Sequence, residues 1–226
     1  PTLAPKGAVF ANQTSSFIGP VPAIAPGARG GKGEACAAPA RSGAWAGPAA
    51  LKRGGRLTSF APMSTSLRGR SVLVTGGTKG IGLGIARVFA GLGAGVCIAG
   101  RNEEEGRAAQ AALAKDGGRV RFCRADVRRR AELDKAAAET AAAFGGIDVL
   151  CANAGILPQA RIADMSEADW DDIFATNAKG MLFSLQACLP WLQRSSAGRV
   201  VLTSSITGPL TGYPGWSHYG ASKAAM

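Results

Sequence analysis

From residue 71 onward, short apolar runs alternate with longer segments whose apolar residues recur at helical spacing. The run Ser71-Val72-Leu73-Val74-Thr75 is compact and rich in β-branched residues, which is typical of a buried strand. The next segment places Ile81, Ile85, Val88, Phe89 and Leu92 on one face of a helix. The same alternation predicts strands over 71–75, 96–99, 120–124, 147–151 and 199–203, and helices over 81–92, 103–115, 131–144, 168–192 and from about 219.

Strands separated by helical crossovers predict a parallel sheet that is covered on both faces. We therefore expect an α/β fold with a doubly wound parallel sheet, in three layers (αβα). In such folds ligands bind outside the carboxyl ends of the strands. Every candidate motif described below falls at such an end.

Residues 1–66 differ from the rest of the chain in composition. They carry seven Lys/Arg against one acidic residue, Glu34, and eight of the twelve prolines. Without a sustained hydrophobic period they are expected to form a disordered basic extension before a domain over 67–226. This acid-poor, Arg- and Ser-containing segment resembles an organelle transit peptide, which would place the protein in a chloroplast or mitochondrion. Alternatively, translation starts at Met63, residues 1–62 are an artefact of gene prediction, and the protein is cytoplasmic.

The charge pattern argues against two classes of partner. The net charge is +11, but +6 of it belongs to residues 1–66, and no basic patch interleaved with aromatic residues follows. Nucleic acid is therefore not an expected partner. No apolar stretch approaches the roughly 20 residues that span a bilayer, so a membrane is not expected either. The run Arg128-Arg129-Arg130 is expected to cap or solvate the start of a helix.

Cysteine and histidine usage argues against a metal site. The five cysteines are odd in number and include no CxxC pair, and His218 is the single histidine. No disulfide scaffold, zinc site or other metal site follows from this. Cys97, Cys123 and Cys151 lie in predicted strands, where a free thiol behaves as a small buried hydrophobe.

A glycine-rich turn joins the first predicted strand to the first predicted helix. It reads Gly76-Gly77-Thr78-Lys79-Gly80-Ile81-Gly82, with the spacing G-x-x-x-G-x-G. Glycines at such a turn let backbone N–H groups approach a pyrophosphate, and the helix N-terminus adds partial positive charge. The strand before and the helix after are the context that such a site requires, so the turn is predicted to bind a nucleotide.

Tyr219 and Lys223 lie four residues apart, fourteen and eighteen residues after Ser205. On a helix this spacing puts the phenol and the ammonium side by side. A neighbouring cation favours the phenolate, which makes the phenol a usable general acid or base. The Ser205 hydroxyl could hold a carbonyl oxygen beside it.

These motifs together resemble the short-chain dehydrogenase/reductase family, from about Arg68 to the end of the chain. The elements that carry the resemblance are Thr75 to Gly82, Cys151-Ala152-Asn153-Ala154-Gly155, Asn177, Ser205 and Tyr219-x-x-x-Lys223. The resemblance implies a Rossmann-type NADP-binding domain and an oxidoreductase that acts on CH-OH groups. Family members run further, through two more strands and a substrate-covering loop. The chain is therefore expected to be a fragment that lacks its C-terminal strands.

The resemblance also assigns roles to residues. Catalysis falls to Asn177, Ser205, Tyr219 and Lys223. Cofactor binding falls to Gly76, Thr78, Lys79, Gly80, Ile81, Gly82, Arg101, Asp126, Val127, Asn153, Ala154, Gly155, Tyr219 and Lys223. In the family the tyrosine gives a proton to the developing alkoxide, the serine hydrogen-bonds that oxygen, the lysine binds the nicotinamide ribose and the asparagine positions a water. Ser204 competes with Ser205, which is preferred because Ser205-Ile206-Thr207-Gly208 matches the family pattern.

The end of the second strand bears on the choice of cofactor. It reads Ala99-Gly100-Arg101-Asn102 and lacks the acidic residue that usually binds the ribose hydroxyls of NAD. Arg101 could pair with a 2′-phosphate, and Lys79 offers a second cation facing the same place. These cations favour NADP(H). Alternatively, Arg101 ends a strand and faces solvent. Asp126 matches the family position that contacts adenine.

The substrate is predicted less specifically than the chemistry. Residues 203–209 and 212–219 resemble family members named 3-oxoacyl-acyl-carrier-protein reductases of fatty-acid synthesis. The resemblance thus implies a small-molecule carbonyl substrate carried on acyl carrier protein, and a homotetramer. Two alternatives stay open: a reductase of another ketone, sugar or steroid-like carbonyl, and a truncated NADP-binding or interaction module without turnover.

Overall fold

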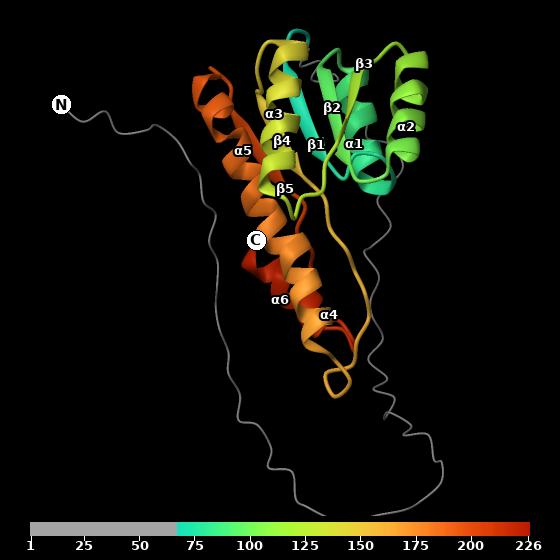
Figure 1. The fold of residues 1–226 in the computed structure, drawn as a ribbon, viewed down its shortest axis with the longest axis vertical. Coiled ribbons are helices and arrows are strands. Elements are labelled where there is room, and N and C mark those ends of the chain that lie inside the picture. Colours follow the sequence, from blue (N-terminus) through green and yellow to red (C-terminus); the bar gives the residue numbers. More distant parts are fainter. Residues whose placement is uncertain (1–66) are drawn as a thin grey trace, which may run out of the picture. The chain divides into compact units, whose positions relative to one another are not determined.

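A computed structural model describes residues 67–226, and the extension predicted over residues 1–66 lies outside the described residues. The described part contains a five-stranded, entirely parallel sheet in the order β3-β2-β1-β4-β5 (Figure 1). Its strands are β1 (Ser71–Thr75), β2 (Gly95–Gly100), β3 (Arg119–Arg124), β4 (Val149–Ala152) and β5 (Arg199–Leu202). Its helices are α1 (Gly80–Gly91), α2 (Glu103–Lys115), α3 (Arg130–Phe144), α4 (Glu167–Ile173), the π-helical segment η1 (Phe174–Lys179), α5 (Gly180–Arg194) and α6 (Ser217–Ala225).

Helices cover both faces of the sheet, as the alternation of strands and helices predicts. Successive residues of a strand point to opposite faces, so Leu73 joins one apolar cluster while Val72 and Val74 join the other. The Leu73 cluster includes Leu133 of α3 and Cys188 of α5, and the second cluster draws on α1 and α2. The three-layer doubly wound fold is confirmed (Figure 1).

The long helix predicted over 168–192 is interrupted in the structure. The chain runs through α4 and the π-helical η1 into α5, with helical backbone at Ile173 and Gly180 on either side of η1. A π-helical turn adds one residue within the helical path, and such turns are frequent at functional sites. Hydrophobic spacing does not reveal so short a change of period, so the interruption was not predicted. Asn177 lies within it.

Asp148, just before β4, connects the amino ends of β1 and β4 to the C-terminal end of α5. Its carboxylate accepts hydrogen bonds from the Ser71 backbone N–H at 2.9 Å, the Arg70 guanidinium at 3.1 Å and the Ser195 hydroxyl at 2.6 Å. Burial alone would raise the pKa of Asp148, but these donors together outweigh burial and hold it below its ordinary value. The amino ends of β1 and β4 are thus fixed to the end of α5.

The four cysteines in the described part of the chain are buried and free, as expected for small apolar side chains. Cys97 and Cys123, on the neighbouring strands β2 and β3, bring their Sγ atoms to 3.1 Å. Among residues 67–226, the helices are all too short or too polar to cross a membrane. That same stretch holds no group of three or more His, Cys, Asp or Glu side chains that could bind a metal ion.

Candidate active site

A cavity of about 770 Å³ opens at the carboxyl ends of the strands, within the range of small-molecule sites. It is lined by segments that follow β1, β2, β3, β4 and β5 in turn and by the first turns of α6. The lining includes the predicted residues Gly76, Thr78, Lys79, Ile81, Gly82, Arg101, Asp126, Val127, Asn153, Ala154, Gly155, Tyr219 and Lys223. The topology therefore gathers nearly all of the predicted site at one place.

The glycine turn after β1 forms one wall of the cavity. Gly76 and Gly80 have positive φ values of 65° and 54°, which side-chain-bearing residues rarely adopt. At Gly82 an added Cβ would collide with the Gly76 carbonyl oxygen and would lie 2.6 Å from the Asn153 amide nitrogen. Gly80 itself does not line the cavity, and its positive φ allows the chain to bend into α1. The turn is thus shaped so that backbone can lie close to a ligand.

The start of α1 leaves donors facing this wall. Lys79 occupies the N-cap with an extended backbone, and its own side chain does not accept a capping hydrogen bond. The first N–H groups of a helix have no partner within it, and they carry partial positive charge. Such a terminus beside a glycine turn suits the phosphates of a nucleotide.

Asn153, after β4, supports the turn from behind. Its side-chain amide donates to the Thr75 and Gly76 carbonyl oxygens at 3.2 and 3.3 Å. Its backbone N–H donates to the Thr75 hydroxyl at 3.1 Å, and its side-chain oxygen accepts from the Thr203 hydroxyl at 3.3 Å. One side chain therefore joins the ends of β1, β4 and β5.

The two predicted cations differ in their surroundings. Lys79 pairs with Glu105 at 3.3 Å, although both side chains are largely exposed to solvent. Within residues 67–226, neither an ion pair nor a hydrogen bond engages the Arg101 guanidinium, while its backbone carbonyl accepts from Arg124 at 3.4 Å. Arg101 is the cation left available to an anionic ligand at this end of the cavity.

Asp126 and Val127 follow β3 and line the same end. The Asp126 carboxylate is gripped by Arg128, and this pairing is the main reason why the pKa of Asp126 lies below its ordinary value. The run Arg128-Arg129-Arg130 is predicted to cap or solvate the start of α3. Arg129 holds the N-cap position and its side chain is exposed without a capping hydrogen bond, whereas Arg128 turns to Asp126 instead. An arginine two residues after an acid does not by itself signal a shared contact, so the sequence did not reveal this pairing.

Tyr219 and Lys223 come together on α6 at the opposite end of the cavity. The Lys223 ammonium nitrogen lies 5.8 Å from the centre of the Tyr219 ring and donates to the Thr203 carbonyl oxygen at 2.6 Å. Lys223 is only 5% exposed, and burial lowers its pKa. A cation and a phenol thus share one wall, as their spacing predicts.

Asn177 lies behind this wall rather than in the cavity lining. Its side chain accepts from the Ile156 backbone N–H at 2.8 Å and donates to the Ile156 carbonyl oxygen at 3.0 Å. A Cβ on Gly155 would lie 3.2 Å from the Asn177 side-chain oxygen and 3.6 Å from the Lys223 nitrogen. Both side chains therefore approach the position where a side chain at residue 155 would lie, and glycine leaves room for them.

The structure places Ser204, rather than Ser205, in the cavity lining. The Ser204 hydroxyl donates to the Lys223 carbonyl oxygen at 3.0 Å, and the Ser205 hydroxyl accepts from the Thr207 N–H at 3.1 Å. Thr203, which precedes them, also lines the cavity and was not singled out from the sequence. Its position at the end of a strand is the signal that could have found it. The role of Ser205 stays a prediction.

Comparisons with known proteins follow this geometry. The model of the short chain dehydrogenase family matches residues 70–226. The 3-oxoacyl-acyl-carrier-protein reductase FabG of Chlamydia muridarum is 37% identical over 165 residues, which cover 73% of this chain and 66% of that protein. The oxidoreductase UcpA of Salmonella typhimurium is 39% identical over 160 residues, which cover 71% of this chain and 60% of that protein.

A solved structure agrees with these relatives. The crystal structure of a short chain dehydrogenase from Burkholderia cenocepacia in complex with NADP matches with a TM-score of 0.67 and 34% identity, covering 71% of this chain and 65% of that one. The chain thus spans somewhat less than two thirds of the length of these relatives. This chain therefore belongs to the short-chain dehydrogenase family, as the family match shows and as the strand order and the clustered motifs agree.

Proposed function

We propose that the protein is an NADPH-dependent oxidoreductase that reduces a carbonyl group to an alcohol. The observation that carries the proposal is the cavity itself, which has a glycine turn and an unpaired Arg101 at one end and the Tyr219–Lys223 pair at the other. A dinucleotide likewise has its phosphates in one part of the molecule and its reactive ring in another. The relative from Burkholderia cenocepacia binds NADP, which supports the same cofactor here.

The residues present fit such a cofactor. The glycine turn, where Gly82 admits no side chain, would hold the pyrophosphate, and Arg101 would hold a 2′-phosphate. Asp126 and Val127 would contact the adenine, and Lys223 the ribose beside the nicotinamide. When bound, the reduced nicotinamide supplies a hydride.

Tyr219 would then supply the proton. As the carbonyl oxygen of the substrate gains negative charge, the phenol donates to it, and the neighbouring Lys223 ammonium stabilises the phenolate that is left. A serine hydroxyl after β5 would donate to the same oxygen; Ser205 is the family position, and Ser204 is the serine that lines the cavity. Asn177 holds the 155–156 segment that closes this wall.

For the substrate we propose a 3-oxoacyl thioester, carried on acyl carrier protein. The support is the relative from Chlamydia muridarum, which bears that name. The transit peptide predicted for residues 1–66 would agree with fatty-acid synthesis in an organelle. A homotetramer is the assembly we expect.

The test is the loss of NADPH absorbance at 340 nm with acetoacetyl thioesters of coenzyme A and of acyl carrier protein. We expect turnover by the wild-type chain with NADPH and much less with NADH. Y219F should abolish turnover and keep NADPH binding, because the phenyl ring retains the shape of the wall and loses only the proton donor. Turnover by Y219F would overturn the acid assignment.

Two other results would redirect the proposal. Turnover with other ketones but not with the thioesters would contradict the acyl substrate alone. NADPH binding without turnover on any carbonyl would favour a binding module.

A further inference from the structure

The carboxylate of Asp126 is one of the few acidic groups that line the cavity, and its side chain is 13% exposed. It stands at the end that would receive the purine base of a dinucleotide. Its backbone N–H donates to Glu132 of α3 at 2.8 Å, which fixes the main chain beside it.

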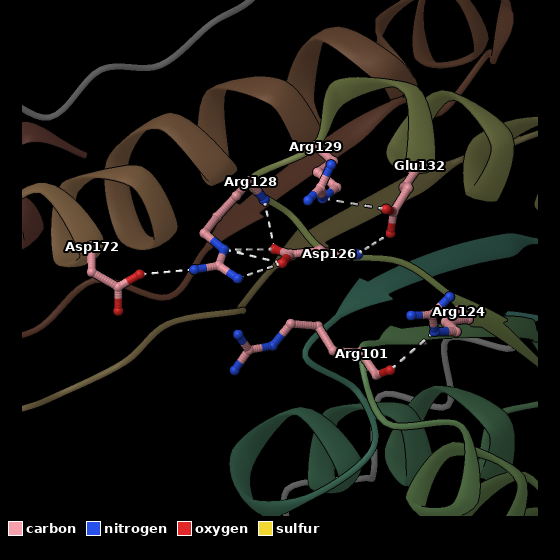
Figure 2. A network of polar contacts seen from close by, with 7 residues as sticks. All are labelled: Arg101, Arg124, Asp126, Arg128, Arg129, Glu132 and Asp172. Atoms are coloured by element: carbon pink, nitrogen blue, oxygen red, sulfur yellow. Dashed lines mark hydrogen bonds and ion pairs between the residues drawn. The ribbon is translucent and has the colours of Figure 1, made fainter.

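Arg128 grips this carboxylate with three N–H donors. Its backbone N–H donates to Oδ1 at 3.0 Å, Nε lies 3.1 and 3.0 Å from Oδ1 and Oδ2, and Nη2 donates to Oδ2 at 2.7 Å. Figure 2 shows the guanidinium between the carboxylates of Asp126 and Asp172. The remaining Nη1 donates to Asp172 of α4 at 2.8 Å.

This grip leaves one acceptor position for a ligand. A carboxylate has about four lone-pair positions, whereas Arg128 brings only three N–H donors, of which Nε is shared between the two oxygens, so there is room for one further donor. A bidentate arginine also fixes the plane of the carboxylate. Arg128 does not line the cavity, so it reaches a ligand only through Asp126.

The other charged groups around Asp126 come from every neighbouring element. Arg101 at the end of β2 extends beneath it without contact, Glu132 of α3 faces its backbone, and Asp172 of α4 is engaged by Arg128 (Figure 2). Arg129 pairs with Glu132 at 3.7 Å rather than with Asp126. Arg128 is therefore the only one of these side chains that directly holds the Asp126 carboxylate.

We propose that Arg128 is a positioning residue that holds Asp126 as a fixed, ionised acceptor for the amino group of a 6-aminopurine. This inference rests on the proposed dinucleotide site and adds the residue that sets its preference for the base. The single free acceptor position matches one N–H of the 6-amino group of adenine. A 6-oxopurine presents a carbonyl oxygen there, and two acceptors repel each other.

The test compares two dinucleotides that differ only in this group, NADPH and reduced nicotinamide hypoxanthine dinucleotide phosphate. Their dissociation constants are measured by nicotinamide fluorescence. We expect the wild-type chain to bind NADPH about tenfold more tightly, because a hydrogen bond to a charged group is at stake. R128M should bring this ratio close to one, since only the backbone N–H of residue 128 would still contact the carboxylate and its plane would no longer be fixed. Reduced nicotinamide mononucleotide, which lacks the adenosine half, should bind both proteins alike.

Two further variants distinguish the contact between Arg128 and Asp126 from the contact with Asp172 and from the charge of Arg128 alone. D172A removes the tether to α4 and leaves the Asp126 contacts intact, so it should keep the wild-type ratio. R128K keeps the charge but cannot donate to both oxygens, so it should show an intermediate ratio. R128K also keeps the test available if R128M fails to fold.

The outcomes are distinct. A wild-type ratio in R128M, or in R128K if only that variant folds, would overturn the inference. An equal loss of the ratio in D172A would also overturn it, because the contact between Arg128 and Asp172 would then be responsible. Failure of the wild-type chain to bind NADPH would instead overturn the proposed function on which the inference rests.

Discussion

The side-chain amide of Asn177 donates a hydrogen bond to the Ser222 hydroxyl across 3.0 Å, and thereby joins the π-helical η1 to α6. Ser222 precedes Lys223 and in turn donates to the Tyr219 carbonyl oxygen at 2.7 Å. The same asparagine holds both backbone groups of Ile156. The Tyr219–Lys223 wall is thus fixed to the 155–156 segment through one fully buried side chain.

N177A should destabilise the fold and slow turnover together. Truncation leaves the Ile156 backbone groups without a partner, and an unpaired buried group costs about 1–3 kcal/mol. S222A is the matched control, because it removes the Ser222 hydrogen bonds to Asn177 and Tyr219 and keeps both Ile156 contacts. Urea denaturation should show a clearly larger loss for N177A than for S222A. Equal losses would mean that the Ile156 contacts contribute little.

G82A should weaken dinucleotide binding, whereas G84A should not. A Cβ at Gly82 meets the Gly76 carbonyl oxygen, so the turn must open. A Cβ at Gly84, on the same helix, meets nothing within 4 Å, and alanine in place of a helical glycine stabilises by about 0.5–1 kcal/mol. Fluorescence titration with NADPH and thermal denaturation check both variants. Unchanged NADPH affinity in G82A would contradict the proposed pyrophosphate site.

The contribution of Lys223 to the free energy of unfolding should increase with pH in the alkaline range. Burial lowers its pKa in the folded chain, so the folded state releases this proton at lower pH than the unfolded state, whose value is about 10.4. Between the two values the unfolded state binds more protons, and stability rises with pH. Wild type should therefore gain stability relative to K223M as pH rises from 7 towards 10. Urea denaturation at several pH values measures this difference, and a constant difference would contradict the burial of a charged ammonium.

Asp148 should contribute stability that disappears in acid. Its pKa is lowered on folding, so the contribution is present above the unfolded value of about 3.9 and is lost as pH falls through the folded value. At pH 7, D148N should lose about 1.5–3 kcal/mol, because hydrogen bonds to a charged acceptor are weakened. The gap between the two proteins should therefore narrow as pH falls below about 3.9. S195A, which removes a single donor, is the milder control, and a gap that grows as pH falls below about 3.9 would contradict the prediction.

The hydrophobic spacing of each segment was enough to predict the fold class, because the predicted strands and helices alternate as a doubly wound sheet requires. The helix predicted over 103–115 coincides with α2, and the strand over 71–75 coincides with β1. The strand predicted over 147–151 lies at 149–152 instead, since Asp148 is occupied with contacts at the sheet end. Boundaries depend on such tertiary contacts, which no local pattern contains.

Those parts of the site were predictable whose geometry follows from the spacing of residues close together in the sequence. The glycine turn and the Tyr219–Lys223 pair are local in sequence, and the structure places them as expected. The grip of Arg128 on Asp126 and the pairing of Lys79 with Glu105 depend on side-chain orientation. Which of two adjacent serines enters the cavity depends on the path of the backbone after β5, which the sequence pattern leaves open.

The central position of β1 has a consequence for the order in which the protein can assemble during synthesis. β1 pairs with β2, which follows closely, but also with β4, whose residues are made much later. The glycine turn relies on Asn153, which is 77 positions away from Gly76. A nascent chain therefore carries the complete glycine motif long before anything holds it in shape. Ligand binding should begin only after the ribosome has released the end of β4, so dinucleotide cannot assist the earliest steps of folding.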